Sequence, residues 1–444
     1  MDKTQQDIAD LNFIISEIDR FLSMPFNEMK VHFQNNKADI FCQVPHPSGK
    51  GHLQCGRRAF GKFSDIAKRH LLTQPHLHRR TDTEQLKQAI IKEFSNVLLR
   101  ESKETDEKRV AVMLSAAVKR IERSLTDITY YIPCVVVVHD EPDQFSIGPV
   151  QFIWMERFLK EIESEVAPKH FSEDLCPYFT KFKWVAEVTI LQCDNETSRL
   201  KADFVVEMAL HFLRLLFAER HGKRLRQAHM PGIQSRGIEL RRKRNGKLLV
   251  LPNWKVDGAQ VAKDWFAELE KSPSVFYLKA MALVLEGILN PSCMTHLHQR
   301  YLDSLSWYGQ GVNELIPAAK ISKYVTGLER LTITKKPTVG GPGLRKTVSA
   351  RAALLCFDPE KDDFQKWFDL AEEVYDCRSD LLHGAMSPFD DTVKRHAVLA
   401  EEIARRSLFR GLELFVSLGQ KTHNATPSDL EKEYQSYLLK FRPK

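Results

Sequence analysis

Residues 362–384 read DDFQKWFDLAEEVYDCRSDLLHG, and this stretch determines how the C-terminal part of the chain is interpreted. Its apolar residues follow the i, i+3, i+4, i+7 spacing of one helix face, with Phe364, Trp367, Val374 and Tyr375 among them. Arg378 takes the next place in that series. A guanidinium on the apolar face of a helix needs a partner or a function. The pattern therefore predicts a helix that carries Arg378 on its inner side.

The helix is expected to end at a glycine. Gly384 follows His383 directly, and glycine is the common residue just after a helix C-terminus. Ser387 and Pro388 come next, and they suit the N-cap and first position of a following helix.

Helical periodicity also surrounds this stretch. It runs from about residue 286, through MTHLHQRYLDSLSWYG at 294–309, to about residue 420. We predict an all-α helix bundle over 286–420 and a C-terminal tail over 421–444.

The first 285 residues have a mixed pattern. Strand candidates lie at 128–138, 145–155 and 183–191, between helical patterns. Residues 238–252 read IELRRKRNGKLLVLP, whose Asn-Gly pair predicts a two-residue hairpin turn. The predicted fold class is α+β, with a mixed α/β domain over 1–170 and a second α/β region over 171–285 before the bundle.

Composition limits the class of protein. The chain has 444 residues, with 43% hydrophobic and 28% charged residues, which is typical of globular domains. The 65 Lys and Arg exceed the 58 Asp and Glu by 7, a mild excess that is compatible with a polyanionic partner. The eight cysteines show no repeated spacing, which favours reduced thiols. No apolar run reaches the roughly 20 residues of a membrane span, and the expected location is the cytoplasm.

YDCRSDLLHGAM at 375–386, preceded by GLERL at 327–331 and followed by a long closing helix pattern, resembles the HEPN superfamily, most closely its Apea-like bacterial branch. The family motif R-x4-6-H corresponds here to Arg378 and His383. The resemblance covers about 130 residues, roughly 290 to 420. It implies a helical bundle that dimerises and brings two Arg/His sets into one cleft that cuts RNA without metal or cofactor. Many members act as toxins or antiphage effectors.

The bare motif is not specific, because the chain satisfies it four times. The matching pairs are Arg69 with His76, Arg214 with His221, Arg224 with His229, and Arg378 with His383. Only the last pair closes a strongly amphipathic helix before a glycine, and its context makes it the candidate.

The residue types suit RNA cleavage. Attack by the 2′-hydroxyl requires a base, an acid for the leaving 5′-oxygen, and positive charge at the phosphorane-like transition state. Histidine, with an ordinary pKa of about 6.5, can act as base or acid, and arginine presents a planar fork to two phosphate oxygens. Ser379 and Asp380 are candidates for orienting His383 or binding ribose, and Glu329 for pairing with Arg378. Arg378 and His383 are separated by roughly 140° on an ideal helix, so both reach one cleft only if the helix ends or distorts.

A structural interpretation stays open. Arg378 would then be a cation paired with Glu329 or Asp380, and His383 would bond to the last helix carbonyls. In that case the bundle is a catalytically inactive module that binds RNA or nucleotide, or a dimerising scaffold.

Two other groups of residues are candidates for binding. The run Arg241, Arg242, Lys243 and Arg244 at the predicted hairpin is a candidate RNA contact or a solvated charged turn. A second group has the spacing C-x3-H-x5-H-x2-C of possible tetrahedral zinc ligands, which are Cys42, His46, His52 and Cys55. Its inner spacing is short for a zinc finger, and metal is not favoured there.

Together with the resemblance to the HEPN superfamily, the sequence predicts a cytoplasmic HEPN endoribonuclease with RNA as substrate and no membrane partner, and the resemblance implies a toxin or antiphage effector that forms a homodimer through the bundle. The region 1–285 is expected to sense a phage-derived or cellular trigger, or to restrain the nuclease.

Overall fold

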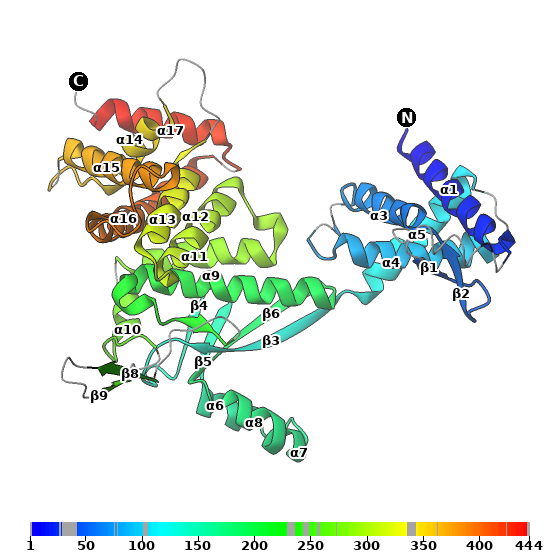
Figure 1. Cartoon of the computed structure of the whole chain (residues 1–444), viewed down its shortest axis with the longest axis horizontal. Coiled ribbons are helices and arrows are strands. Elements are labelled where there is room, and N and C mark those ends of the chain that lie inside the picture. Colours follow the sequence, from blue (N-terminus) through cyan, green and yellow to red (C-terminus); the bar gives the residue numbers. More distant parts are fainter. Residues whose placement is uncertain are drawn as a thin grey trace. The chain divides into compact units, whose positions relative to one another are not determined.

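The protein forms two compact units in a computed structural model (Figure 1). Unit 1 comprises Met1–Ile128 and Ile190–Leu200, and unit 2 comprises Thr129–Thr189 and Lys201–Lys444. The boundary expected at residue 170 therefore falls inside unit 2. The structure describes residues 2–25, 28, 42–74, 76–77, 79–100, 105–228, 236–242, 248–254, 258–271, 273–334, 343–361, 363–422 and 424–441.

In its described residues, unit 1 is mainly helical and contains one β-hairpin. Its elements are α1 Lys3–Ser23, β1 Cys42–Pro45, β2 His52–Cys55, α3 Arg57–Leu71, α4 Thr83–Glu93, η1 Phe94–Leu99 and α5 Glu107–Ser124. The apolar faces of the helices bury one core, which includes Leu11, Ile14, Phe63 and Phe94. Removal of these side chains from water is the main stabilising contribution to this unit.

A cluster of charged side chains joins α1 to α3. Asp7 and Asp10 are 1% and 3% exposed, and Arg69 donates to both, at 2.6 and 2.7 Å. The Nε2 atom of His70 lies 2.7 Å from the other oxygen of Asp7. Because buried carboxylates need compensating charge, this cluster explains the positions of Arg69 and His70.

A five-stranded sheet has the strand order β4-β5-β6-β3-β7. Strands β4 and β5, β5 and β6, and β3 and β7 pair antiparallel. The strand candidates at 128–138 and 183–191 are confirmed as β3 and β6, whereas the candidate at 145–155 forms two strands, β4 and β5. Helix α9 (Asn195–Gly222) lies along one face of this sheet (Figure 1). The strands are β3 Thr126–Val135, β4 Gln144–Ile147, β5 Val150–Trp154, β6 Trp184–Cys193 and β7 Arg226–Gln227.

Short elements surround the sheet in unit 2. They are α6 Met155–Ile162, α7 Pro168–His170, η2 Phe171–Leu175, α8 Cys176–Phe179 and α10 Trp265–Leu269. The predicted hairpin is confirmed as β8 (Arg236–Arg242) paired antiparallel with β9 (Leu248–Trp254). Its Asn-Gly turn lies outside the described residues.

Helix α9 is interrupted at Ala218, where φ is 56° and ψ is 176°. A non-glycine residue with positive φ is uncommon and costs free energy unless its surroundings hold it. Arg405 of α16 (Thr392–Lys421) donates to the backbone oxygens of Leu215 and Leu216, at 2.8 and 3.1 Å. The arginine thus provides donors for carbonyl groups that a helix break leaves short of partners.

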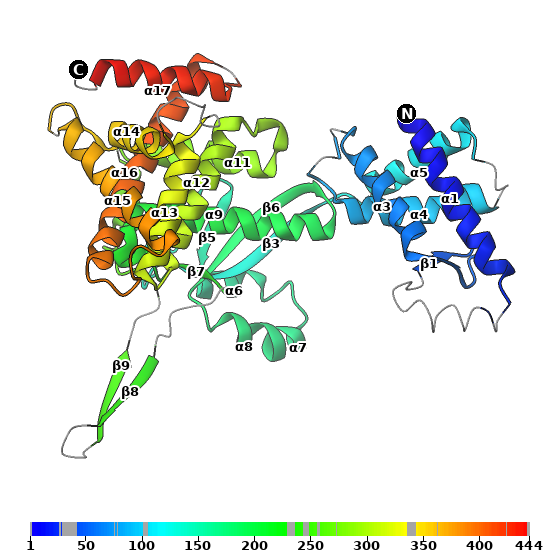
Figure 2. The same ribbon diagram turned by 45° about the horizontal axis from the view of Figure 1, so that its top comes forward.

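The C-terminal part of unit 2 is helical, which confirms that prediction (Figure 2). The buried residues include Tyr301, Leu305, Leu328 and Leu408. The predicted tail is itself helical over most of its length. The elements are α11 Val275–Leu289, η3 Pro291–Cys293, α12 His296–Asn313, α13 Pro317–Thr332, α14 Leu344–Cys356, α15 Phe364–His383, α16 Thr392–Lys421 and α17 Pro427–Phe441.

Helix α17 packs on α14 through a buried ion pair. Arg351 of α14 is 3% exposed, and its Nη2 atom lies 2.7 and 2.8 Å from the carboxylate oxygens of Glu431. Its Nη1 atom donates to the Thr332 carbonyl at 2.6 Å. Burial opposes ionisation of Glu431, but hydrogen bonds from Thr334, Gln435 and Arg351 lower the pKa of this carboxyl to about 2.

Gly384 ends α15, as the sequence predicted, with a left-handed backbone at φ 77°. The prediction that the next helix starts at Ser387 and Pro388 is wrong, because α16 begins at Thr392. The Ser387 hydroxyl accepts a hydrogen bond from the Phe389 N–H at 3.2 Å, and the Ser387 carbonyl accepts one from the Asp390 N–H at 3.0 Å. These bonds form a turn, which competes with N-capping.

Candidate active site

Arg378 lies on α15 at the edge of the helix face that packs into the bundle. Trp367, Val374 and Tyr375 of this face are buried, whereas the Arg378 side chain is 24% exposed. The Asp363 side chain caps α15 by accepting from the Gln365 N–H at 2.9 Å. The periodicity thus predicted the helix and its buried face, and Arg378 is half-buried.

The predicted partner of Arg378 is nearby. Nη2 of Arg378 lies 3.9 Å from Oε2 of Glu329 on α13. Oε1 of Glu329 accepts a hydrogen bond from the Tyr375 hydroxyl at 2.9 Å. Burial and this hydrogen bond raise the pKa of Tyr375 to about 12, so it remains a donor at neutral pH. The Arg378 guanidinium carbon lies 5.9 Å from the centre of the Tyr375 ring.

The guanidinium of Arg378 is held loosely compared with that of Arg351. Both residues leave Nε buried without a hydrogen-bond partner among the described residues. The terminal nitrogens differ: those of Arg351 make hydrogen bonds of 2.6 to 2.8 Å, and those of Arg378 make none to any described residue, with 3.9 Å to Glu329 as the ion-pair distance. The terminal nitrogens of Arg378 are therefore available to a ligand.

His383 is the last residue of α15 and is exposed. Its imidazole makes no hydrogen bond or ion pair with any residue that the structure describes. Because α15 is continuous to His383 and Gly384 turns the chain only afterwards, Arg378 and His383 are separated by roughly 140° around the helix axis. Within one copy of the chain, the two side chains lie on different faces.

The proposed supporting residues flank the helix end. Ser379 and Asp380 are partly exposed. The backbone carbonyl of Asp380 accepts hydrogen bonds from the N–H groups of Gly384, Ala385 and Met386. This backbone cap, and not the carboxylate of Asp380, fixes the helix terminus.

The other described arginines of the R-x4-6-H matches have structural contacts. Arg69 belongs to the Asp7 and Asp10 cluster, and Arg214 is fully buried beside Glu207 at 2.8 Å. Arg224 has an interaction partner, while His229 lies outside the described residues. These contacts explain Arg69 and Arg214 without a catalytic role.

The zinc candidates of unit 1 do not come together as four ligands. Cys42 and Cys55 are directly opposite each other in the β1–β2 pair, but His52 is opposite Pro45. The Nδ1 atom of His46 lies 2.6 Å from the Ser48 hydroxyl. No cluster of three or more His, Cys, Asp or Glu residues with metal-binding geometry occurs in the described parts of the chain.

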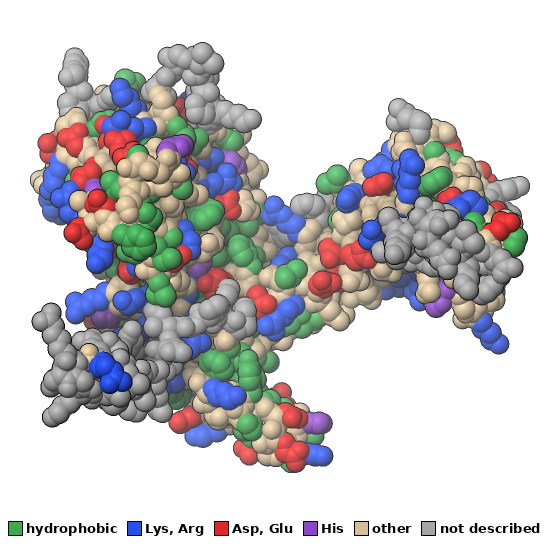
Figure 3. All heavy atoms as spheres, in the orientation of Figure 1, with side chains coloured by type: hydrophobic (Ala, Val, Ile, Leu, Met, Phe, Trp, Pro, Cys, Tyr) green, Lys and Arg blue, Asp and Glu red, His purple; other side chains and the backbone are tan. Residues whose placement is uncertain are grey.

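The basic hairpin is described only in part. Arg241 and Arg242 end β8, and the Arg242 side chain is exposed. Lys243 and Arg244 lie outside the described residues. On the face drawn in Figure 3, Lys and Arg side chains of unit 2 alternate with acidic and hydrophobic ones. Charge on this face therefore does not by itself mark a nucleic-acid path.

Exposed apolar side chains around the end of α15 could not be identified from the sequence. Leu382 is 57% exposed, Phe389 in the connecting turn is 93% exposed, and Val398 on α16 is 69% exposed. Large exposed apolar side chains that lie on neighbouring elements are typical of protein interfaces. We call Leu382, Phe389 and Val398 the apolar set.

Comparison with protein-family models, curated proteins and solved structures finds no match to this chain. None of the described helices is both long enough and apolar enough to cross a bilayer.

Proposed function

We propose that the chain is a metal-independent endoribonuclease of the HEPN type that acts as a homodimer. The observation that carries the proposal is the exposure and hydrogen bonding of the Arg378 guanidinium. Its guanidinium is partly exposed, makes no hydrogen bond to a described residue, and belongs to an R-x4-H motif whose histidine is exposed. A cation with unused donors is suited to binding phosphate.

A dimer would allow arginine and histidine side chains to meet in one cleft although Arg378 and His383 of one copy lie on different faces of α15. Arg378 and His383 of one copy face different directions, and one histidine supplies one titrating group where the reaction uses both a base and an acid. Two copies that pack through the apolar set would bring two histidines and two arginines to a shared cleft. The exposure of Phe389 supports this arrangement.

The chemistry assigned to the residues is transesterification. One His383 removes the proton from the 2′-hydroxyl, and the 2′-oxygen attacks phosphorus. The bond from phosphorus to the 5′-oxygen breaks, and the second His383 protonates that oxygen. Arg378 stabilises the negative charge on the equatorial oxygens of the transition state. The products are a 2′,3′-cyclic phosphate and a 5′-hydroxyl.

In the cell, we propose the role of a cytoplasmic toxin or antiphage effector. Unit 1 and the sheet of unit 2 would sense a trigger or restrain cleavage. The basic hairpin of β8 and β9 would contribute phosphate contacts through Arg241 and Arg242.

A second candidate function is an inactive HEPN scaffold that dimerises or binds RNA or nucleotide. One observation favours it: Arg378 lies within 3.9 Å of Glu329 and near the Tyr375 ring, contacts that also suit a structural cation.

Incubation of the purified full chain with total cellular RNA in EDTA separates the two functions. The nuclease gives fragments with cyclic phosphate ends, and the scaffold leaves the RNA intact. Cleavage that requires added magnesium would contradict the proposed mechanism, because Arg378 and His383 are assigned all of its chemistry.

A further inference from the structure

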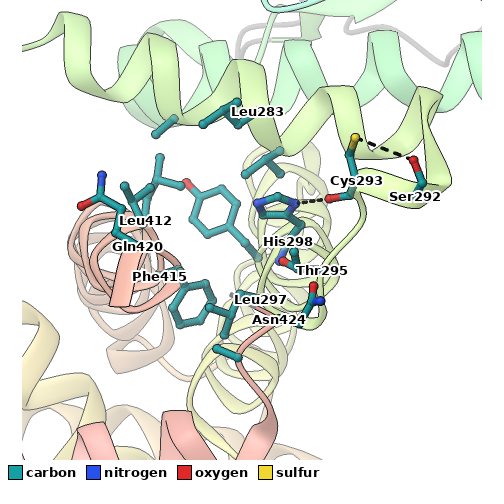
Figure 4. A pocket seen from close by; sticks show the side chains of 16 residues that line it. Leu283, Ser292, Cys293, Thr295, Leu297, His298, Leu412, Phe415, Gln420 and Asn424 are labelled. Atoms are coloured by element: carbon teal, nitrogen blue, oxygen red, sulfur yellow. Dashed lines mark hydrogen bonds between the residues drawn. The ribbon is translucent and has the colours of Figure 1, made fainter. Parts of the chain in front are cut away.

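Unit 2 contains a cavity that is separate from the residues of the R-x4-H motif. It lies between α11, the start of α12 and the C-terminal part of α16, and its volume is about 450 Å³ (Figure 4). This volume lies within the range of small-molecule sites. Much of its wall is apolar and includes Leu283, Leu297, Leu412, Phe415 and Val416.

The lack of charged side chains in the described wall restricts what can bind. Among the described residues that line the cavity, none is Asp, Glu, Lys or Arg. A charged ligand would lose hydration there without gaining a counter-charge. The wall therefore favours an uncharged, mostly apolar molecule.

One polar group of the wall has no partner. Tyr301 is 0% exposed, and its hydroxyl makes no hydrogen bond to any described residue. Burial raises the pKa of Tyr301 well above its usual range, so the hydroxyl is a neutral donor. A buried donor without an acceptor costs free energy, which a ligand with an acceptor would recover.

His298 provides the complementary group. Its Nδ1 atom lies 3.2 Å from the Cys293 carbonyl (Figure 4), and a carbonyl requires the N–H to be on Nδ1. Burial lowers the pKa of His298, so the ring is neutral and Nε2 is an acceptor. The cavity wall thus carries one hydroxyl donor and one imidazole acceptor on residues of the same helix.

Two features of the wall show open space. A Cβ atom added at Gly419 of α16 would meet no atom within 4 Å. Leu283 is 61% exposed although it lines the cavity, and Cys293, which also lines it, is exposed. Because Gly419 lines the cavity, a larger side chain at this position can occupy part of it without a clash at its first atom.

We propose that this cavity binds an uncharged, mostly apolar small molecule that accepts a hydrogen bond from the Tyr301 hydroxyl. The site is independent of the proposed nuclease function, since it shares no residue with that motif. It lies between α11, α12 and α16 and would be a second ligand site of unit 2, in addition to the proposed RNA site at Arg378 and His383.

Prodan, an uncharged naphthyl ketone whose emission depends on its surroundings, is a suitable probe for the full chain. We expect saturable binding with a shift of emission to shorter wavelength. The variant Tyr301→Phe removes only the hydroxyl and should weaken binding roughly three- to tenfold, the effect of one hydrogen bond. Gly419→Phe should abolish saturable binding because the ring fills the cavity.

Gly61→Phe is the matched control. Gly61 also lies in a helix, α3, and a Cβ atom there also meets nothing within 4 Å, but it is in unit 1. This variant should bind prodan like the native chain. A folded Gly419→Phe variant that binds like the native chain, or a native chain with no saturable binding, would overturn the proposal. Unchanged affinity in Tyr301→Phe would overturn the assigned hydrogen bond.

Alkylation of Cys293 gives a second measurement that needs no variant. Saturating prodan should slow its reaction with N-ethylmaleimide several-fold, measured by mass spectrometry of the Cys293 peptide. Cys176 lies outside the cavity, is partly exposed, and serves as the internal reference. If prodan binds and the rate at Cys293 is unchanged, the probe is bound elsewhere and the proposal fails.

Discussion

The guanidinium of Arg378 and the carboxylate of Glu329 lie 3.9 Å apart, at the outer limit of an ion pair, whereas Arg351 and Glu431 of the same unit lie 2.7 Å apart. The difference separates two roles for arginine in the bundle. Arg351 is buried and its partner Glu431 is largely buried, so removing the Arg351 side chain leaves the Glu431 carboxylate without a compensating charge. Arg378 is partly exposed, and Glu329 keeps its hydrogen bond from Tyr375 when Arg378 is removed.

This contrast predicts different stabilities for two alanine variants. Arg351→Ala should lower the free energy of unfolding by about 3 to 5 kcal/mol, the usual effect of breaking a buried pair. Arg378→Ala should change it by less than about 1 kcal/mol, because its ion pair with Glu329 is long and partly exposed and no hydrogen bond is lost. Urea denaturation followed by circular dichroism measures both. Similar losses in the two variants would identify Arg378 as a structural cation.

The Glu431 carboxylate predicts how unfolding depends on pH. Its pKa in the folded chain is about 2, below the ordinary value of 4.5. The ionised form is therefore favoured by folding, and its contribution is complete above pH 4.5 and is lost as the pH falls towards 2. Glu431→Gln should remove this part of the acid dependence. A variant with the same pH profile as the native chain between these values would contradict the assignment.

The apolar set predicts the oligomeric state. The native chain should sediment as a dimer, and Phe389→Asp should shift it towards the monomer because a carboxylate in an apolar interface must be desolvated. Leu439→Asp is the matched control, since Leu439 is also highly exposed, at 86%, but lies on α17. A native monomer that cleaves RNA, or a Phe389→Asp variant that stays dimeric, would exclude the proposed interface.

Arg378→Lys tests how Arg378 acts. Lysine keeps the positive charge but loses the planar fork that holds two phosphate oxygens. We expect a folded dimer with cleavage reduced at least about tenfold, the effect of losing one charge-assisted hydrogen bond. Initial rates on a defined RNA measure this. Arg345→Lys controls for the chemical change, because Arg345 of α14 is 46% exposed and pairs with Glu372 and Asp376 of α15, the helix that carries Arg378. Equal rates for both variants would remove the fork from the mechanism.

The sequence predicted local features of the fold better than long-range ones. The apolar periodicity from Phe364 to Tyr375 predicted α15, and Gly384 predicted its end, because both depend on residues close in the chain. The unit boundary near residue 128 was not predicted, because it depends on pairing such as that of Cys134 with Gln227. The start of α16 was wrong because the side chain of Ser387 bonds within a turn.

The candidate site was predictable in its residue types and only partly in its geometry. The pairing of Arg378 with Glu329 was expected, and helix geometry alone gave the angle between Arg378 and His383. The exposure of Phe389 and the loose contact of Arg378 were not predictable, because exposed fractions and distances depend on how α13, α15 and α16 pack.

Cleavage of total cellular RNA in EDTA by the His383→Ala variant tests the central claim most directly. His383 is exposed and makes no hydrogen bond or ion pair with a described residue, so the variant should fold and dimerise like the native chain. The matched control is His170→Ala, because His170 is an exposed histidine of unit 2, at 72%, outside the bundle. The account predicts that the native chain and the His170→Ala variant produce RNA fragments with cyclic phosphate ends, while the His383→Ala variant produces none. Cleavage by His383→Ala at the native rate, or no cleavage by the native chain, would contradict it.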